Sequence, residues 1–132
     1  MIAIDTSAIV AIALNEPERD GFETTILAAA KALISTVSVV EAKMVVHGRK
    51  GARAVVLLED YLKLPVFEIT SPTLADMNAA YAAFVAFGKG SGHPAALNFG
   101  DLFAYALAKV RNLPLLFKGA DFAETDILPA HP

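Results

Sequence analysis

The chain contains no cysteine, and its longest nearly continuous apolar stretch is short. Without cysteine there is no disulfide framework and no thiolate metal site, which suits a reducing compartment and argues against structural zinc. The apolar stretch, around residues 7–14, is far below the roughly 20 residues that a transmembrane helix needs, and no basic flank precedes it. We therefore expect an unexported, cytoplasmic protein that does not interact with membranes.

The chain also has little positive charge. Its 11 Lys and Arg residues are outnumbered by 14 Asp and Glu residues, so the formal net charge is −3. This balance argues against binding nucleic acid through overall positive charge, and an RNA partner would have to meet a local basic patch or a bound cation. The sequence also lacks a Walker lysine loop and a Gly-x-Gly-x-x-Gly fingerprint, which argues against a nucleotide cofactor.

What is present is the pattern of one α/β domain spanning residues 1–132, of which 55% are apolar. Hydrophobic periodicity and breaker residues predict alternating elements. We expect strands at 2–4, 33–36, 66–69 and 115–117 with a short edge strand at 127–128, and helices at 7–14, 18–31, 39–47, 52–62, 71–87 and 98–111. This alternation predicts a three-layer α/β/α domain around a small, mainly parallel sheet.

Four acidic residues occupy comparable places in this pattern. Asp5 directly follows the first strand, and Asp121 closely follows the fourth. Glu41 and Asp101 are expected in the first turns of two helices. Because sites in open parallel sheets form beyond the carboxyl ends of the strands, we expect the four carboxylates to gather at one edge of the sheet.

Each acidic residue taken singly also has a structural explanation. Glu41 and Asp101 stand three residues after Ser38 and Asn98, the spacing of a helix capping box, and Asp5 could cap the first helix. Taken together, like charges in one cleft repel each other unless a cation joins them. An all-oxygen ligand set of this kind suits Mg²⁺.

Four short motifs carry a resemblance that extends over nearly the whole chain. They are DTSA at 5–8, STVSVVE at 35–41, GDLFAYA at 100–106 and LFKGADF at 116–122, with Thr125-Asp126-Ile127 beyond the last. In their order and spacing they resemble the motifs of PIN-domain ribonucleases, in particular the VapC-like toxins of bacterial toxin–antitoxin modules. The resemblance implies a PIN-like fold and a Mg²⁺- or Mn²⁺-dependent endoribonuclease, in which metal-activated water hydrolyses an RNA phosphodiester.

The resemblance also implies site residues and partners. Catalytic, metal-binding roles fall to Asp5, Glu41, Asp101 and, as the fourth carboxylate, Asp121. Asp126 lies close enough in sequence to compete for the fourth place or to support it. Thr6 either orients Asp5 or a metal-bound water, or belongs to the helix cap. The implied partners are a cognate VapB-like antitoxin and a second copy of the chain in a homodimer.

Several further residues have two interpretations each. The basic residues His47, Arg49, Lys50 and Arg53 either receive RNA phosphates or complement a helix end. Lys89 and His93 lie in a glycine-rich loop that could touch the substrate. Lys118, after the fourth strand, either neutralises a phosphate or pairs with a carboxylate.

Apolar residues in three expected helices exceed what one core-facing stripe requires, in the segments 11–14, 22–27 and 55–62. They form either an apolar groove for the antitoxin or an ordinary core.

Two other functions compete with the ribonuclease. A receiver-type phosphoryl-transfer domain needs a phosphoacceptor aspartate after a central strand, but the strand at 66–69 is followed by Thr70-Ser71-Pro72. The second alternative is a non-catalytic PIN-like module that binds RNA or protein and uses its carboxylates only as helix caps.

Overall fold

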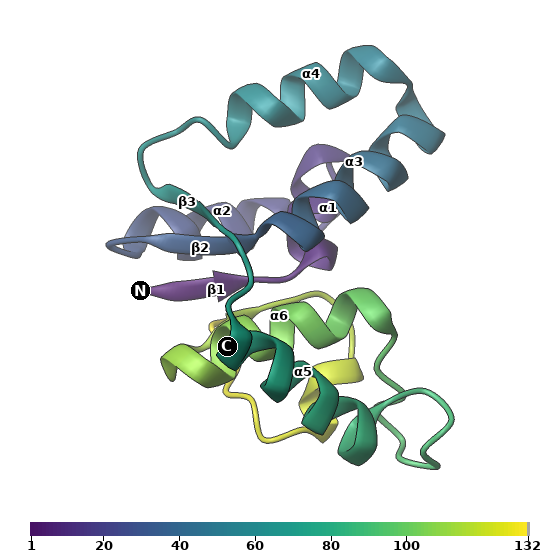
Figure 1. Cartoon of the computed structure of the whole chain (residues 1–132). Coiled ribbons are helices and arrows are strands. Elements are labelled where there is room, and N and C mark those ends of the chain that lie inside the picture. The colour runs from purple at the N-terminus through teal and green to yellow at the C-terminus, as the bar shows by residue number, and fades with distance from the viewer. Residues whose placement is uncertain (132) are drawn as a thin grey trace.

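The computed structural model describes residues 1–131, so the expected end of the domain at Pro132 lies outside the described residues. In chain order the elements are β1 (Ile2–Ile4), α1 (Thr6–Ala13), α2 (Arg19–Ala28), β2 (Ala32–Ser35), α3 (Thr36–Lys50), α4 (Ala52–Tyr61), β3 (Phe67–Thr70), α5 (Leu74–Phe87), α6 (Phe99–Arg111), β4 (Leu115–Leu116) and the 3₁₀ turn η1 (Asp121–Glu124) (Figure 1). Within this described part, no helix combines the length and apolar character needed to cross a bilayer.

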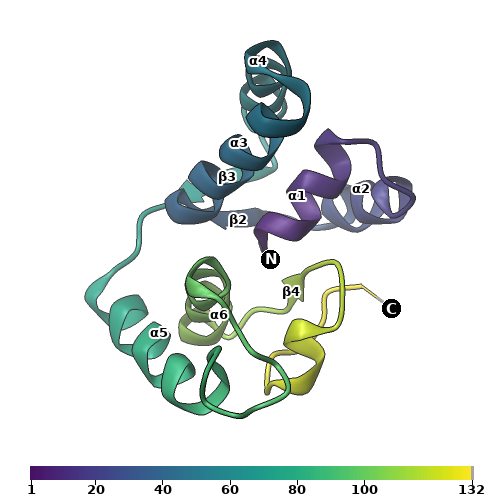
Figure 2. The same cartoon turned by 90° about the vertical axis from the view of Figure 1, so that its right-hand side faces the viewer.

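The strands form one parallel sheet in the order β3-β2-β1-β4. Alternate side chains of β1, β2 and β4 enter different cores: Ile2 and Ile4 of β1 pack among α1 to α4, whereas Ala3 packs among α5 and α6. Figure 2 shows these two groups of helices on opposite faces of the sheet. The expected three-layer α/β/α fold is therefore confirmed, and burial on both faces explains the nearly continuous apolar strands.

The chain leaves the carboxyl ends of β1 and β4 toward opposite faces of the sheet. After β1 the chain turns into α1 on one face of the sheet. After β4 it turns toward the other face, where Phe122 of η1 is buried in the core of α5 and α6. Neighbouring strands whose following segments diverge in this way leave room between them, which is where ligands of open α/β sheets bind.

One expected element is absent from the structure, and several helices differ from their expected bounds. Residues 127–128 form no strand, and a single bridge joins Leu115 to Pro129 instead. Pro129 has no amide hydrogen to donate, which limits the ladder at this edge. The helix expected at 39–47 is longer at both ends: it begins earlier because its cap is Ser35, and it continues to Lys50 before Gly51 ends it.

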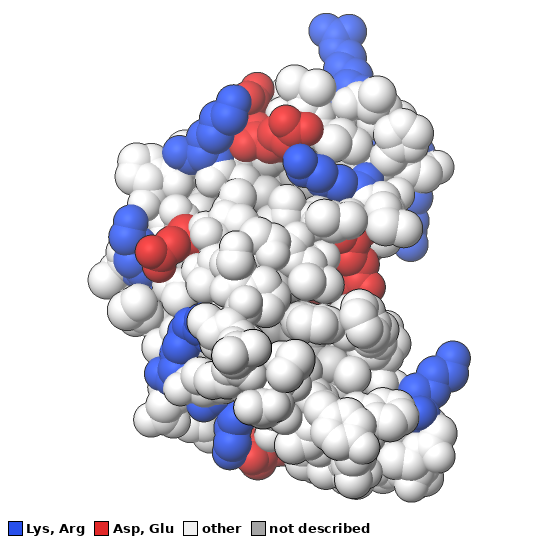
Figure 3. Space-filling model, viewed as in Figure 1, with Lys and Arg blue, Asp and Glu red and all other residues white. Residues whose placement is uncertain are grey.

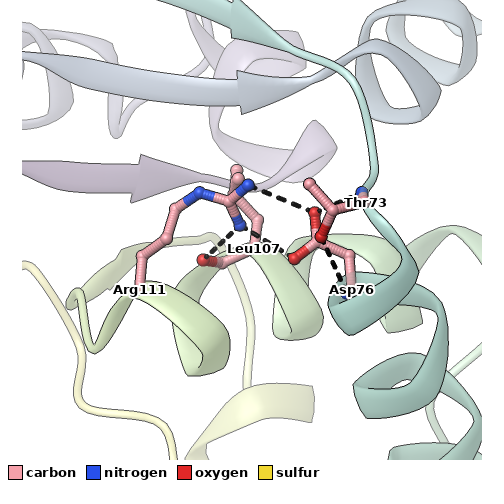
Figure 4. A network of polar contacts seen from close by, with 4 residues as sticks. All are labelled: Thr73, Asp76, Leu107 and Arg111. Atoms are coloured by element: carbon pink, nitrogen blue, oxygen red, sulfur yellow. Dashed lines mark hydrogen bonds and ion pairs between the residues drawn. The ribbon is translucent and has the colours of Figure 1, made fainter.

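A buried ion pair ties α5 to α6 (Figure 4). The guanidinium of Arg111 donates to both oxygens of Asp76, at 2.9 and 3.2 Å. Asp76 also completes a capping box with Thr73 at the start of α5. The pair therefore fixes the beginning of α5 against the end of α6, the helix that carries Asp101.

Candidate active site

Asp5 is the most buried of the candidate carboxylates, with 2% of its surface exposed. It caps α1, because one oxygen, Oδ2, accepts from the backbone N–H of Ser7 at 2.9 Å and from the Ser7 hydroxyl. The other oxygen, Oδ1, is buried with no hydrogen-bond partner in the described structure. The pKa of Asp5 is raised to about 7, mainly by burial and also by the charges of Asp101 and Glu41, against the opposing Ser7 hydrogen bonds.

Asp101 also combines a cap with a perturbed charge. Its Oδ2 accepts from the backbone N–H of Asn98 at 3.0 Å, while the Asn98 side chain accepts from the Asp101 N–H, so the expected capping box is confirmed. Burial raises the pKa of Asp101 to about 6, and the charges of Asp121 and Glu41 add to this effect. Capping accounts for only one of its two oxygens.

Glu41 also lies at this site, but in a different helical turn from the one expected. Ser35, where β2 ends, caps α3 by accepting from the N–H of Val37, so Ser38 is not the cap and Glu41 lies in the second helical turn. The Glu41 carboxylate lies against Gly100, and a Cβ added to that glycine would overlap both carboxylate oxygens. The present position of the Glu41 carboxylate therefore depends on a residue without a side chain at 100.

Asp121 is exposed at the start of η1, and its charge contributes to the raised pKa of Asp101. The four candidate carboxylates thus act on one another electrostatically. Figure 3 shows acidic side chains in a hollow on the side toward which β1 points in Figure 1. The sheet edge expected from the sequence is where they gather.

The donor set fits a hard divalent cation. Among residues 1–131, no three acidic or histidine side chains converge closely enough to form a complete metal cage as they stand. Mg²⁺ does not require such a cage, because one or two carboxylates with water and substrate phosphate complete its shell. The buried, unpartnered Oδ1 of Asp5 and the raised pKa of Asp101 are the features that a cation would relieve.

Comparison with known proteins identifies the family and the fold. The sequence pattern of the PIN domain matches residues 2–128. The chain belongs to the PIN domain family. Among its relatives, ribonuclease VapC30 of Mycobacterium tuberculosis is 40% identical over 126 residues, which cover 96% of this chain and 95% of the relative. Ribonuclease VapC of Mycolicibacterium smegmatis is 38% identical over 130 residues, covering 98% of this chain and 100% of that one.

Solved structures show the same PIN fold at lower sequence identity. VapC20 of Mycobacterium tuberculosis, described as a toxin that cleaves the sarcin-ricin loop, matches with a TM-score of 0.82 and 16% identity over the whole of both chains. The VapBC2 structure from Rickettsia felis, bound to a DNA fragment from its promoter, matches with a TM-score of 0.77 and 18% identity over 98% of this chain and 96% of that one.

Two residues expected near the centre of the PIN site are engaged elsewhere. Asp126 accepts from the Tyr105 hydroxyl and from Lys109 Nζ, both at 2.7 Å. Burial opposes ionisation of Asp126, but these two hydrogen bonds outweigh it and lower its pKa. The Thr6 hydroxyl donates to the carbonyl of Ser38 at 3.4 Å and so links α1 to α3.

The lysine after β4 pairs with carboxylates, one of the two roles considered for it. Lys118 Nζ lies 3.2 Å from Glu16 and 3.4 Å from Glu18. Its backbone N–H donates to the Ser7 hydroxyl at 2.9 Å, and the same hydroxyl donates to Asp5. Ser7 was not identified from the sequence as a partner of Asp5. The signal was its position two residues after a capping aspartate, where a side chain or backbone N–H commonly bonds to the cap. Nor was Ser38 identified as a buried residue whose hydroxyl has no partner in the described structure.

The basic cluster of the PIN domain lies at the far end of α3. His47, Arg49 and Lys50 occupy its last turn and Arg53 follows in α4, all of them exposed. In the glycine-rich loop Lys89 is exposed, whereas His93 Nδ1 accepts from the Ala95 N–H at 3.0 Å.

The structure contains an apolar groove of the kind that the sequence suggested. Two of the three expected apolar segments line it. It lies between α1 and α4, has a volume of about 210 Å³, and is lined by Ile12, Ala13, Arg19, Ala54, Leu57, Leu58 and Tyr61. Phe22 and Ile26 of α2 belong to the core instead.

Proposed function

We propose that this chain is a Mg²⁺- or Mn²⁺-dependent endoribonuclease and the toxin of a VapBC-type toxin–antitoxin pair. The observation that carries the proposal is the buried Oδ1 of Asp5, which has no hydrogen-bond partner and belongs to a carboxylate surrounded by other negative charges. Burying such a group is unfavourable unless a cation joins it. The relatives named ribonuclease VapC support RNA as the substrate.

In this proposal Asp5, Glu41 and Asp101 supply the oxygen ligands, and Asp121 adds negative charge at the exposed rim. A bound Mg²⁺ or Mn²⁺ would activate a water and compensate the charge that develops at an RNA phosphodiester. The chain's own residues hold the ligands in place: Ser7 and Asn98 each engage one oxygen of Asp5 and Asp101. The second oxygen of each carboxylate is left for the cation.

We further propose one domain over residues 1–132 and assign its partners. The family match over residues 2–128 and the sheet shared by both cores support a single unit. We assign RNA phosphates to Arg49, Lys50 and Arg53, which are exposed and cationic. We assign a VapB-like antitoxin to the groove between α1 and α4, because that groove is mainly apolar and lies apart from the carboxylates.

A non-catalytic binding module is the second candidate function. Asp5 and Asp101 both make well-formed helix caps, so their presence does not by itself require catalysis. In that case the protein would fold with these caps and hold no divalent ion.

The deciding experiment measures cleavage of a total RNA pool by purified, antitoxin-free protein with Mg²⁺ or Mn²⁺. Asp5→Asn and Asp101→Asn each retain a side-chain oxygen for the cap, and Asp20→Asn changes an exposed carboxylate of α2 as the matched control. We expect cleavage by wild type and Asp20→Asn, and a loss of at least about 100-fold for the two site variants, since each removes a ligand of the catalytic ion.

Calorimetric titration with Mn²⁺ separates the two candidate functions. Cleavage that chelator abolishes, together with Mn²⁺ binding that the site variants lose, supports the ribonuclease. A folded wild-type protein that neither binds Mn²⁺ nor cleaves RNA would instead leave the binding module as the better account.

A further inference from the structure

A second groove opens directly beside the candidate carboxylates. It runs between α3 and the beginning of α6 and has a volume of about 530 Å³. Its lining consists of Val37, Val40, Glu41, Met44, Asn98, Phe99 and Gly100. Glu41 and Gly100 belong to the carboxylate site itself, so whatever occupies this groove lies next to the reacting phosphate of a bound substrate.

The apolar lining of this groove is not part of the protein core. Helix α3 buries one face through Val39, Ala42 and Val46. Val40 and Met44 stand outside that face, with 57% and 70% of their surfaces exposed. An apolar surface that contributes nothing to the core points to a binding role.

Phe99 is the aromatic wall of this groove. It is the first residue of α6 and is 73% exposed, although it is large and apolar. The Phe103 ring supports it from one side in an edge-to-face contact, with the ring centroids 5.1 Å apart. A ring held in this way, with most of its surface free, suits stacking against a planar ligand.

Besides Glu41, the groove has one further polar side chain, Asn98, which is suited to binding a hydrogen-bond acceptor. The carbonyl oxygen of the Asn98 side chain accepts from the Asp101 N–H at 2.9 Å. This bond fixes the amide and leaves its amino group to donate. A nucleobase provides both a flat apolar face and ring or carbonyl acceptors.

The surroundings favour a nucleic acid over an apolar peptide. Met44 also lines a neighbouring hollow with Lys43, His47 and Val55, so the groove continues along α3 toward the basic cluster. From Glu41 to Lys50, α3 rises by about 14 Å at 1.5 Å per residue. One end of this path meets the proposed cation site and the other meets exposed positive charge, an arrangement suited to successive phosphates.

We propose that this groove holds an unpaired nucleobase adjacent to the scissile phosphate, with Phe99 as its stacking surface and the Asn98 amino group as its hydrogen-bond donor. The inference rests on the proposed ribonuclease function. Stacking of a base on an aromatic side chain is tolerant of sequence, whereas the Asn98 donor favours bases that present an acceptor. Phe99 and Asn98 are therefore specificity-determining residues of the substrate site.

The test uses a single-stranded RNA that the wild type cleaves at one position, with an abasic nucleotide on either side of the cleaved bond. We expect one of the two abasic RNAs to be cleaved roughly 5- to 100-fold more slowly, the range of one lost stacking contact. Phe99→Ala should show the same loss on intact RNA and no longer distinguish it from that abasic RNA. Leu27→Ala, which removes an equally exposed apolar side chain from α2, should behave like wild type.

A fluorescence measurement tests base binding without cleavage. Because the chain has no tryptophan, Phe99→Trp in an Asp5→Asn background introduces a unique reporter that can still stack. We expect intact RNA to quench its emission and the abasic RNA to leave it unchanged.

The results separate failure of the inference from failure of the proposed function. If wild type cleaves RNA but Phe99→Ala cleaves intact and abasic RNA at wild-type rates, the groove does not bind a base and a protein partner becomes its occupant. If wild type cleaves nothing, the ribonuclease proposal fails. In that case quenching by intact RNA alone still supports a base site, and its absence overturns it.

Discussion

At the scale of single residues, Gly100 is the glycine in contact with a candidate carboxylate. Alanine normally stabilises a helix relative to glycine by up to about 1 kcal/mol. At Gly100, however, a Cβ would overlap the Glu41 carboxylate. We expect Gly100→Ala to displace Glu41 and to lower both Mn²⁺ affinity and RNA cleavage by about 10-fold or more, the usual cost of disturbing a metal ligand. Titration calorimetry and initial cleavage rates measure the two effects.

The matched control is Gly21→Ala in α2, where a Cβ meets nothing within 4 Å. This exposed helical glycine should follow propensity alone, so the variant should gain up to about 1 kcal/mol in stability and keep its activity. Wild-type Mn²⁺ affinity in Gly100→Ala would show that the contact with Gly100 does not hold the Glu41 carboxylate in place for the ion.

The sequence indicated which residues belong to the candidate site more fully than it indicated what surrounds them. The positions of Asp5 and Asp101 after a strand and in a first helical turn indicated both their caps and their common edge. Glu41 was assigned correctly to that edge but to the wrong turn, because Ser35 and Ser38 are equally good capping residues by type. The contact between Glu41 and Gly100 joins two helices far apart in sequence and left no local signal.

At the scale of elements, the pair of Asp76 and Arg111 holds α5 onto α6. Only 4% of the Asp76 side chain and 23% of the Arg111 side chain are exposed. Asp76→Ala removes the ion pair and half of the Thr73 capping box, leaving a mostly buried guanidinium unpaired. We expect a loss of about 2–4 kcal/mol in the free energy of unfolding, measured by urea denaturation.

An exposed ion pair provides the comparison. Lys63 and Asp60 lie 3.4 Å apart with 76% and 62% of their side chains exposed. Lys63→Ala should therefore change stability by less than about 1 kcal/mol. Equal effects of the two substitutions would mean that the α5–α6 tie adds no more than a surface contact.

The order of elements was predictable, whereas contacts between them were not. Alternating apolar runs and breakers identified each strand of the sheet, and two-sided burial explains why β1, β2 and β4 are so apolar. The short edge strand at 127–128 was wrong, since an apolar pair followed by proline suits a single bridge equally well. Nothing in the sequence linked Asp76 to Arg111, because ion pairs between distant helices depend on tertiary packing.

At the scale of the whole molecule, one face of α5 is suited to a second copy of the chain. Leu74, Met77, Tyr81, Phe84 and Val85 are all large, apolar or aromatic, and exposed. Between Leu74 and Phe87, all of which the structure describes, Asp76 is the one charged residue, and it is buried. Two copies that each carry a net charge of −3 repel least where their surfaces have no charge. We therefore expect the homodimer implied by the family to form across α5, around a two-fold axis.

Tyr81→Glu places a charge in the middle of this face and should raise the dimer dissociation constant by about 10-fold or more, because a buried unpaired carboxylate is costly. Light scattering across a concentration series measures the change in mass. Leu27→Glu, at a 73% exposed position of α2, should leave the dimer intact. A wild-type chain that stays monomeric at high concentration would contradict the assignment.

The carboxylate site should also make the stability of the whole metal-free molecule depend on pH. Folding raises the pKa of Asp5 from 3.8 to about 7 and that of Asp101 to about 6, so the folded protein binds protons more tightly than the unfolded chain. This tighter proton binding stabilises the folded state relative to the unfolded chain. The stabilisation is fully present below pH 3.8 and is lost as the pH rises through about 7. Asp76 acts in the opposite direction, since its lowered pKa makes its contribution disappear as the pH falls. We expect the melting temperature to be highest in mildly acidic buffer and to decline toward neutral pH.

Asp5→Asn tests this origin because asparagine caps a helix as well as aspartate but cannot ionise. Without metal, the variant should melt above wild type at pH 8 and lose less stability between pH 5 and pH 8, a difference of roughly 1 kcal/mol or more for each pKa unit involved. Mn²⁺ should raise the wild-type melting temperature at pH 8, where the carboxylates are ionised, and leave that of Asp5→Asn nearly unchanged. Superimposable pH profiles would show that Asp5 carries no unfavourable charge in the folded protein. A stabilised but inactive Asp5→Asn would instead mean that the chain gives up stability to keep a buried carboxylate ready for a cation.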